Sequence, residues 1–162
     1  MCSDLDAGNQ DSKLRYACGS FFQQQRTMKT QSSLELSDIQ AIAAAAQAEA
    51  QKNNWAVSIA IVDAGGHLFH FQRLDGAPPI SAHIAPAKAK TAALGRRESK
   101  IYEDIINGGR VSFLTAPEVE GLLEGGVPIM KDGFCLGAVG VSGVKSNEDA
   151  QIAKAGIAAI GL

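Results

Sequence analysis

Hydrophobic residues follow a helical period in the first patterned part of the chain. Between Ser37 and Lys52, apolar side chains recur every three or four positions, as they do on one face of an α-helix. These positions are Ile39, Ile42, Ala43, Ala46 and Ala50. Ser37 followed by Gln40 is typical of a capping box, and Asn53-Asn54 would end the helix. The pattern predicts a helix over about residues 37–52.

The next segment changes to the two-residue period of a β-strand. In residues 55–63, one face would carry Trp55, Val57, Ile59 and Ile61, and the other Ala56, Ser58, Ala60 and Val62. Small residues on the second face would let a helix pack close to the strand. The turn sequence of residues 63–66 leads to a returning strand at 67–75. The two strands are expected to form a hairpin.

A helical segment follows the rigid connector of residues 76–79. Residues 80–95 have helical composition, and Gly95 would stop the helix. Proline inside a helix removes a hydrogen bond and costs about 3 kcal/mol. We therefore expect the regular helix to begin near Pro86, with residues 80–85 as an irregular lead-in.

A shorter helix and a loop complete the middle of the chain. The helix would cover about residues 98–107 and end at Asn107-Gly-Gly. Residues 113–125 are interpreted as a loop with a helical turn after Pro117.

The last third of the chain predicts a second hairpin and a final helix. Asp132-Gly133 is a strong hairpin signal between strands at 127–131 and 134–141. Ser146 would cap the last helix, with Asp149 three residues on. The order α-β-β-α-α-β-β-α predicts an α+β, profilin-like fold, in which helices flank a mostly antiparallel sheet of two hairpins.

Glycines spaced by three in the last strand raise the question of a phosphate-binding loop. A dinucleotide fingerprint lies in a turn between a parallel strand and its helix. Gly137 and Gly140 instead lie inside the second strand of a hairpin. Glycine there marks close approach of another backbone or of a ligand. The two glycines would point to opposite faces, one towards a packed helix and the other towards a flat ligand or a neighbouring subunit.

Composition narrows the class of protein. The 162 residues carry a net charge of −2 without a long basic run, which argues against nucleic-acid binding. No apolar stretch approaches the roughly 20 residues of a membrane helix. Residues 1–33 are polar and aperiodic, so we expect a flexible N-terminal extension before one domain at 34–162. No secretory signal is recognised in the extension, and we expect a cytoplasmic protein.

The three cysteines are an odd count without the spacing of a metal site. Cys135 lies in an apolar run and is expected to be a buried thiol. A disulfide between Cys2 and Cys18 has no support from their spacing. No zinc motif and no Ser-His-Asp arrangement was found, and no metal site is predicted.

Several motifs together resemble the GlcG/HbpS family, which includes the C-terminal domain of PduO. The resemblance spans about residues 35–161. Its motifs are Asp63–Gly66, Arg73–Ala77, Lys88–Ala92, Gly125–Ile129, Gly133–Gly143 and Asp149–Gly156. It implies a small α/β domain that forms homo-oligomers and tends to bind haem. Members also occur beside glycolate or propanediol metabolism.

Haem requires an apolar slot, partners for its propionates and usually an axial ligand such as histidine. His83 lies in the connector before Pro86, and His70 lies in mid-strand; both are candidate ligands. The alternative is that His67 and His70 are partly exposed strand residues.

Other candidate ligand-binding residues lie in the motifs. Lys88 and Thr91 could bind an anion, and Lys88 could also be a catalytic amine. The alternative for Lys88 is an ion pair with Asp75 or Glu98.

Arg73 and Asp75 would either line the site or pair with each other. Gly125, Gly126 and Pro128 would present backbone N–H groups to an anion or form a tight entry to the strand. Asp149 and Ser142 are interpreted as structural.

The sequence supports three functional hypotheses. The first is an accessory protein of the GlcG/HbpS type that binds haem, another tetrapyrrole or a small ligand. The alternative is a cofactor-independent isomerase, hydratase or lyase that moves protons on a small carboxylated metabolite, using Lys88, Arg73, Asp75 and His83. The third is a subunit that mainly serves assembly. The many Ala and Gly residues favour a homo-oligomer, a dimer or a larger ring.

Overall fold

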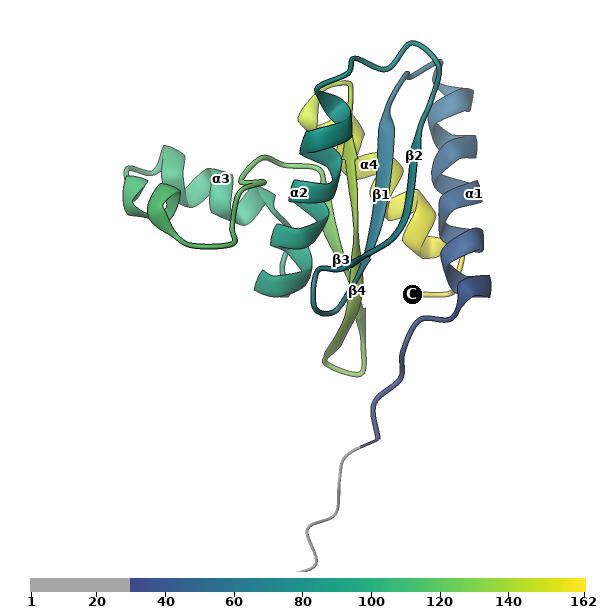
Figure 1. Cartoon of the computed structure of the whole chain (residues 1–162), viewed down its shortest axis with the longest axis horizontal. Helices are drawn as coiled ribbons and strands as arrows, with labels where there is room; N and C mark the ends of the chain where they lie inside the picture. Colours follow the sequence, from purple (N-terminus) through teal and green to yellow (C-terminus); the bar gives the residue numbers. More distant parts are fainter. Residues whose placement is uncertain (1–29) are drawn as a thin grey trace, which may run out of the picture. The chain divides into compact units, whose positions relative to one another are not determined.

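The order of helices and strands confirms the sequence prediction. The computed structural model describes residues 30–162 (Figure 1). The elements are α1 (Leu36–Lys52), β1 (Ser58–Asp63), β2 (Leu68–Arg73), α2 (Ser81–Gly95), α3 (Lys100–Asn107), the 3₁₀ helix η1 (Val111–Thr115), β3 (Gly126–Lys131), β4 (Phe134–Ser142) and α4 (Ser146–Ala158). Residues 1–29 of the predicted extension, with Cys2 and Cys18, lie outside the described residues. The domain limit at residue 34 stays a prediction.

The four strands form one antiparallel sheet in the order β2-β1-β4-β3. β1 pairs with β2 and β3 pairs with β4, as the two predicted hairpins require. The hairpins join through β1 and β4, which are also antiparallel. This arrangement confirms the α+β class and leaves β2 and β3 as the two edges of the sheet.

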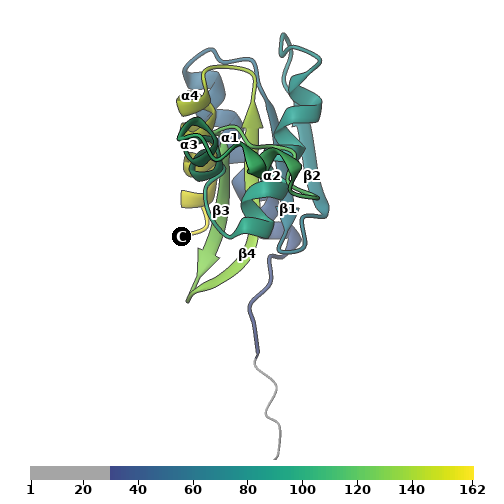
Figure 2. The same ribbon diagram turned by 90° about the vertical axis from the view of Figure 1, so that its left-hand side faces the viewer.

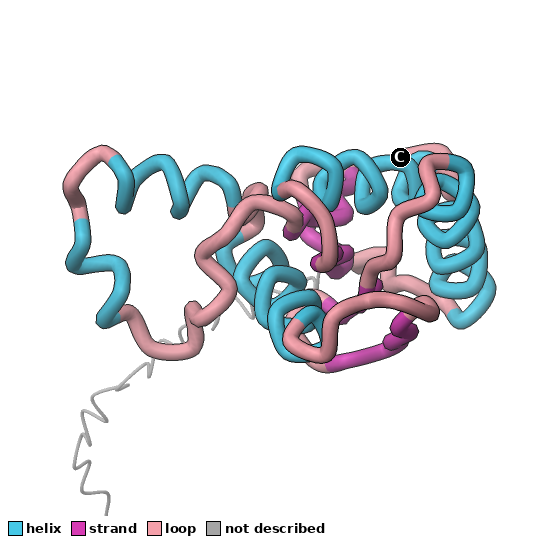
Figure 3. Tube along the Cα trace, turned by 90° about the horizontal axis from the view of Figure 1, so that it is seen from above, coloured by secondary structure: helices cyan, strands magenta, loops and turns pink. Residues whose placement is uncertain are grey.

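Helices cover both faces of the sheet (Figure 2). α1 and α4 pack on one face, where they enclose the larger apolar core. That core consists of Ile39, Ile42, Ala43, Ala46, Ala50, Val57, Ile59, Ile61, Val127, Ile129, Leu136, Val139, Val141, Ile152, Ala153 and Ile157. α2 packs on the other face, and seen from above the strands lie between the two helical layers (Figure 3).

The layer between α2 and the sheet is built almost entirely of small residues. It contains Ala60, Val62, Ala85, Ala89, Ala92, Ala93 and Ala138. A side chain at Gly140 would place its Cβ 2.2 Å from the carbonyl oxygen of Ala85. Gly137 points to the opposite face, towards Leu34. The predicted close packing of a helix on the small face of β1 is therefore confirmed.

Both hairpin turns have the backbone conformation or hydrogen bonds that their residues favour. Asp132 and Gly133 have φ angles of 50° and 79°, the positive values of a type I′ turn. In the first hairpin, Oδ1 of Asp63 accepts hydrogen bonds of 2.8 Å from the N–H groups of Gly65 and His67. The first turn is thus tied to the side chain of a single aspartate.

The predicted helix caps were wrong. α1 begins at Leu36, and its cap is formed by the N–H of Glu35, which donates to Asp38 at 2.9 Å. α4 is capped by Lys145, whose N–H donates to Glu148 at 3.1 Å. Asp149 does not occupy the N3 position of the cap; its Oδ1 accepts the N–H of Val144 at 3.3 Å, just before the helix, and its Oδ2 accepts from a lysine of another helix.

α2 also differs from the prediction, since it runs without interruption through Pro86 from Ser81 onwards. Hydrogen bonds hold its first turn: the hydroxyl of Ser81 donates to the Pro78 carbonyl at 2.6 Å and lies 2.8 Å from that of Ser58. Gly95 is the last helical residue, and Arg96 takes the left-handed conformation. Tertiary packing, rather than the local cost of proline, therefore decides where this helix begins.

α3 and η1 extend to one side of the sheet (Figures 1 and 3). Tyr102 of α3 packs edge-on against Phe113 of η1. Tyr102 also lies where a side chain at Gly95 would stand, which explains the glycine there. The predicted helical turn after Pro117 is an ordinary turn instead. Among the described residues, no helix is long and apolar enough to cross a bilayer.

Candidate functional site

Lys88, the predicted catalytic or anion-binding amine, lies inside the molecule. Its Nζ donates to a carboxylate oxygen of Asp149 at 2.8 Å and to the carbonyl of Val141 at 3.1 Å. Only 3% of the Lys88 side chain and 2% of that of Asp149 are exposed. The ion-pair partner is thus Asp149, while the suggested partner Glu98 pairs with Lys154. Burial raises the pKa of Asp149, although Lys88 acts in the opposite direction.

Other motif residues near Lys88 form their hydrogen bonds within the protein. The N–H of Gly126 donates to the hydroxyl of Ser99 at 2.8 Å, and the N–H of Gly121 donates to that of Thr91 at 3.1 Å. A side chain at Gly125 would meet Lys88 Nζ at 2.8 Å. The structure therefore brings Lys88, Thr91, Gly125 and Gly126 together in a tightly packed region. Pro128 lies half-buried in β3, along the edge of the sheet.

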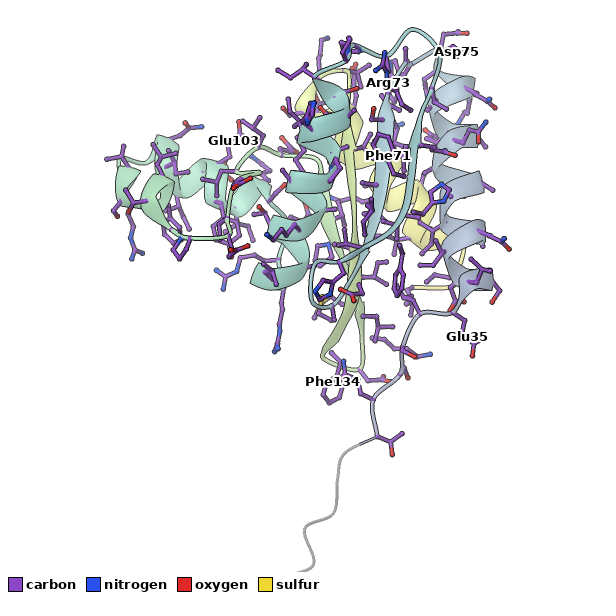
Figure 4. The ribbon with its side chains drawn as sticks, viewed as in Figure 1. Glu35, Phe71, Arg73, Asp75, Glu103 and Phe134 are labelled. Carbon is purple, nitrogen blue, oxygen red and sulfur yellow. The ribbon has the colours of Figure 1, made fainter. Side chains whose placement is uncertain are left out.

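Arg73 and Asp75 lie at another place, at the end of β2 and just after it (Figure 4). Arg73 Nε donates to the carbonyl of Ala77 at 3.1 Å. The suggested Arg73–Asp75 ion pair is not among the salt bridges of the described residues. Both residues line an open groove of about 500 Å³ at the end of α1, which is also lined by Gln47, Gln51, Asn54, Trp55, Ala56 and Leu74.

The three histidines have very different surroundings. His83 is exposed on the first turns of α2. His70 is half-buried in β2, and its Nε2 atom is shielded from water without a hydrogen-bond partner. His67 lies at the start of the returning strand with 83% of its side chain exposed, and its Nδ1 is 3.0 Å from a carboxylate oxygen of Asp63.

Asp63 and His67 form a carboxylate–imidazole pair, an arrangement that also occurs at metal sites. Histidines that bind metals usually donate their second ring nitrogen to a carboxylate or carbonyl, which orients the ring. Burial alone would raise the pKa of Asp63, but hydrogen bonds from His67 and Gly65 hold it below its ordinary value of 3.8. Asp63 therefore stays ionised as a partner of His67. The sequence prediction did not include this contact, because the spacing of Asp63 and His67 does not define the conformation of the turn between them.

Two adjoining hollows lie beside this pair. One, of about 330 Å³, is lined by Gln31, Ser32, Ser33, Leu34, Asp63, Ala64, Gly65, Phe69 and Leu136. The other, of about 260 Å³, is lined by Gln31, Ala64, Arg96, Phe134 and Cys135. They share Gln31 and Ala64. Together they combine apolar side chains with the guanidinium of Arg96, which suits a flat apolar ligand with acidic groups. His67 lines neither hollow, but its ring is held by Asp63, which lines the first.

Cys135 lines the second hollow and is a buried free thiol, as predicted. Its Sγ lies 3.3 Å from the carbonyl oxygen of Gly137. Burial raises the pKa of this thiol. Among residues 30–162, no three His, Cys, Asp or Glu side chains lie close enough to hold a metal ion by themselves.

Comparison with known proteins assigns this chain to a protein family. The family model described as "Haem degrading protein HbpS-like" covers residues 34–158. The chain belongs to the HbpS-like family. Protein GlcG of Escherichia coli K12 is 56% identical over 115 residues, which cover 71% of this chain and 85% of GlcG. The sequence resemblance to GlcG and HbpS is therefore confirmed.

Solved structures of the family share the fold. A crystal structure of HbpS aligns with a TM-score of 0.75 at 30% identity, over 83% of this chain and 95% of HbpS. A crystal structure titled PduOC:Heme complex aligns with a TM-score of 0.72 at 29% identity, over 79% of this chain and 95% of that one.

The family motifs lie in separate regions of this HbpS-like chain, with Arg73 and Asp75 in the groove at the end of α1. The motifs that contain Lys88, Gly125 and Asp149 meet in the buried ion-pair region. The motif that begins at Asp63 forms the turn that orients His67. The side chains of the first region are buried, whereas His67 beside the second is exposed.

Proposed function

We propose that this HbpS-like protein binds haem or a related tetrapyrrole in the hollows beside His67, as an accessory protein of the GlcG/HbpS type. The observation that carries the proposal is the His67 ring held by Asp63, a residue that lines an apolar hollow. The family description and the structural similarity to a haem complex support the same ligand class.

The residues of the hollows fit the chemical needs of haem. His67 would serve as the axial ligand, oriented by Asp63. Leu34, Phe69 and Leu136 would contact the porphyrin. The guanidinium of Arg96 would pair with a propionate, since arginine suits carboxylates. Bound haem would supply a redox-active iron.

Haemin titration of the full chain tests this function. We expect a Soret band that saturates at one haemin per site, and a lost or shifted band in His67→Ala. Asp63→Asn should weaken binding by roughly 10-fold, the lower end of the effect of losing such an oriented partner. His83→Ala is the matched control, because His83 is exposed on α2.

The outcomes separate the possible ligands. If the Soret band is lost in His70→Ala or His83→Ala but unchanged in His67→Ala, the iron ligand is one of the histidines predicted from the sequence and not His67. An unchanged spectrum in all three variants would exclude a histidine ligand. No saturable Soret band in the natural protein would reject haem binding altogether.

The proton-transfer enzyme is the less supported alternative. It requires Lys88 to reach a substrate, and its amine is enclosed between Asp149 and Val141. The groove beside Arg73 and Asp75 is open and polar, so a small carboxylated molecule would bind there instead. Turnover of such a molecule that disappears in Lys88→Met, while the fold and haemin binding persist, would favour the enzyme.

We also propose that the protein works as a homo-oligomer in the cytoplasm. Exposed apolar residues on the edge strand β2 support self-association. A monomeric mass in light scattering over a wide concentration range would contradict it.

A further inference from the structure

The outer edge of β2 carries an unusual concentration of exposed apolar residues. Leu68, Phe69 and Phe71 are 56%, 53% and 37% exposed. Among residues 30–162, β2 pairs only with β1, so its other side is an open edge of the sheet that these residues form. Open edges are templates for pairing with another strand unless proline, charge or a covering segment protects them.

The opposite edge of the sheet is protected in just these ways. β3 contains Pro128, which lacks an N–H group, and ends at the exposed Lys131. The segment before α3 also covers its start, where the N–H of Ser99 donates to the carbonyl of Gly126 at 2.9 Å. β2 has no proline, its one basic end residue is Arg73, and no other described segment is paired with its outer side. The contrast singles out β2 as the edge that is suited to a partner.

The backbone of β2 shows which of its groups face outwards. The N–H of Leu74 donates to the carbonyl of Val57 at 2.9 Å, and the same register pairs Gln72 with Ile59 and His70 with Ile61. Successive residues of a strand direct their backbone groups to opposite sides. Phe71 and Arg73 therefore present their N–H and C=O groups to the outside.

The side chains of His70 and Gln72 also have unsatisfied hydrogen-bonding atoms in the described part of the single chain. Both residues have a side-chain Nε2 atom that is shielded from water and finds no hydrogen-bond partner in the described part of the chain. Unsatisfied buried polar atoms are uncommon in native proteins and point to a missing partner. The two residues share one face of the strand, because they stand two positions apart.

We propose that β2 pairs antiparallel with β2 of a second copy, around a two-fold axis through Phe71. In this register Phe71 faces Phe71 of the other copy, and each His70 faces a Gln72. A side-chain rotation in either residue lets the Gln72 amide form a hydrogen bond with the His70 imidazole of the other copy. Both side chains then have a hydrogen-bond partner. Each Arg73 falls opposite a Phe69, where a guanidinium favours the face of an aromatic ring.

The neighbouring register is less favourable. A two-fold axis through Gln72 would pair the two Gln72 side chains and place each His70 opposite a Leu74, so His70 would stay unsatisfied. Donor and acceptor matching therefore selects a second copy in the Phe71-centred register. The inference specifies the surface of the proposed self-association and does not depend on haem binding.

Disulfide trapping tests the register directly. Phe71→Cys is made in a chain where Cys2 and Cys18 are serine, and the purified protein without haem is mildly oxidised. Facing residues of a hydrogen-bonded antiparallel pair have Cα atoms about 5.5 Å apart, within reach of a disulfide. Arg73→Cys is the matched control, since its two copies would stand four residues out of register, about 14 Å apart.

We expect Phe71→Cys to form at least about ten-fold more covalent dimer than Arg73→Cys, because only its geometry permits the bond. Equal cross-linking of both variants, or none in Phe71→Cys, would overturn the proposal. Circular dichroism confirms that each variant is folded.

Charge variants give a second test that needs no oxidation. Phe71→Lys and Phe71→Glu should each lose at least half of the native assembly mass, because like charges meet on the axis. Mixed one to one, they should restore the assembly as a Lys–Glu heterodimer, measured by native mass spectrometry. The same exchanges at Phe134, which is exposed at the tip of the other hairpin (Figure 4), should leave the mass unchanged. An unaltered mass in the Phe71 variants, or no recovery on mixing, would refute the pairing.

Discussion

Burial controls the chemistry of Cys135. Its side chain lies against the carbonyl groups of Ala93 and Gly137, and burial raises the pKa of the thiol. A protonated thiol is a poor nucleophile, because the thiolate is the reactive form. The sequence predicted the burial from the apolar run around the residue. It did not show that the thiol borders a hollow.

We predict that Cys135 resists alkylation in the folded protein. Iodoacetamide at pH 7.5 should modify it much more slowly than a cysteine introduced at Lys131, which is exposed on the same hairpin. The reason is the combination of a raised pKa and restricted access. Peptide mass spectrometry measures both sites in one variant. Equal rates in the folded state would contradict the burial, and unfolding in urea should make the rates similar.

His67 shows the limit of sequence reasoning about single residues. Strand periodicity places it beside a turn and leaves its function open. The tertiary structure places Nδ1 against the carboxylate of Asp63, which orients the ring. Hydrogen-bond geometry of this kind depends on the turn conformation, so composition and spacing alone could not predict it.

At the scale of elements, α2 and β4 illustrate how small residues bring a helix close to a sheet. The absence of a side chain at Gly140 lets the carbonyl of Ala85 and the N–H of Ala89 approach the strand. The alternation of large and small residues in β1 already predicted this side of the sheet. The same contact shows that Gly140 permits close packing of a helix, as glycine inside a strand suggests.

We predict that Gly140→Ala destabilises the protein by about 1–3 kcal/mol or more, because the added methyl group overpacks a closed layer. Its Cβ would stand 2.2 Å from the Ala85 carbonyl oxygen. Urea unfolding followed by circular dichroism measures the change. Gly108→Ala is the control, since its Cβ meets nothing closer than 3.2 Å. Equal stability of the two variants would show that α2 can move away at little cost.

Helix limits were predicted less well than helix positions. Pro86 did not displace the start of α2, because the hydroxyl of Ser81 is bonded to the Pro78 carbonyl and lies beside that of Ser58. Gly95 is required by the neighbouring Tyr102 rather than by a left-handed backbone. Local propensity is a small energy, and contacts with distant residues outweigh it.

At the scale of the whole molecule, the Lys88–Asp149 pair joins the two helical layers. Lys88 belongs to α2 on one face of the sheet, and Asp149 begins α4 on the other. They meet next to the closely packed Gly125. A buried ion pair adds little over an apolar substitute, but loss of one partner leaves an unpaired buried charge.

We predict that Lys88→Met lowers the free energy of unfolding by about 3–5 kcal/mol at pH 7.5, through the unpaired Asp149 carboxylate. A carboxyl whose pKa is raised by folding contributes stability below its unfolded pKa, and that contribution is lost as pH rises through the folded value. Burial raises the pKa of Asp149 above 3.8, and removal of Lys88 raises it further. The loss of stability should therefore be smaller at pH 4 than at pH 7.5.

Two controls define the outcome. Lys154→Met breaks the exposed pair with Glu98 and should cost at most about 1 kcal/mol at either pH. The double variant Lys88→Met with Asp149→Leu should recover much of the lost stability. A loss in Lys88→Met that does not change with pH would show that the carboxylate is not its cause.

The sequence by itself determined the order of elements, both hairpins, the small face of β1 and the family. These features arise from turn chemistry and residue periods that act over a few neighbouring positions. The tertiary structure alone decided that Lys88 pairs with Asp149, 61 positions away, that Asp63 orients His67, and that β2 is left as an open edge. These features depend on which side chains meet across the fold, and spacing along the chain carries no information about that.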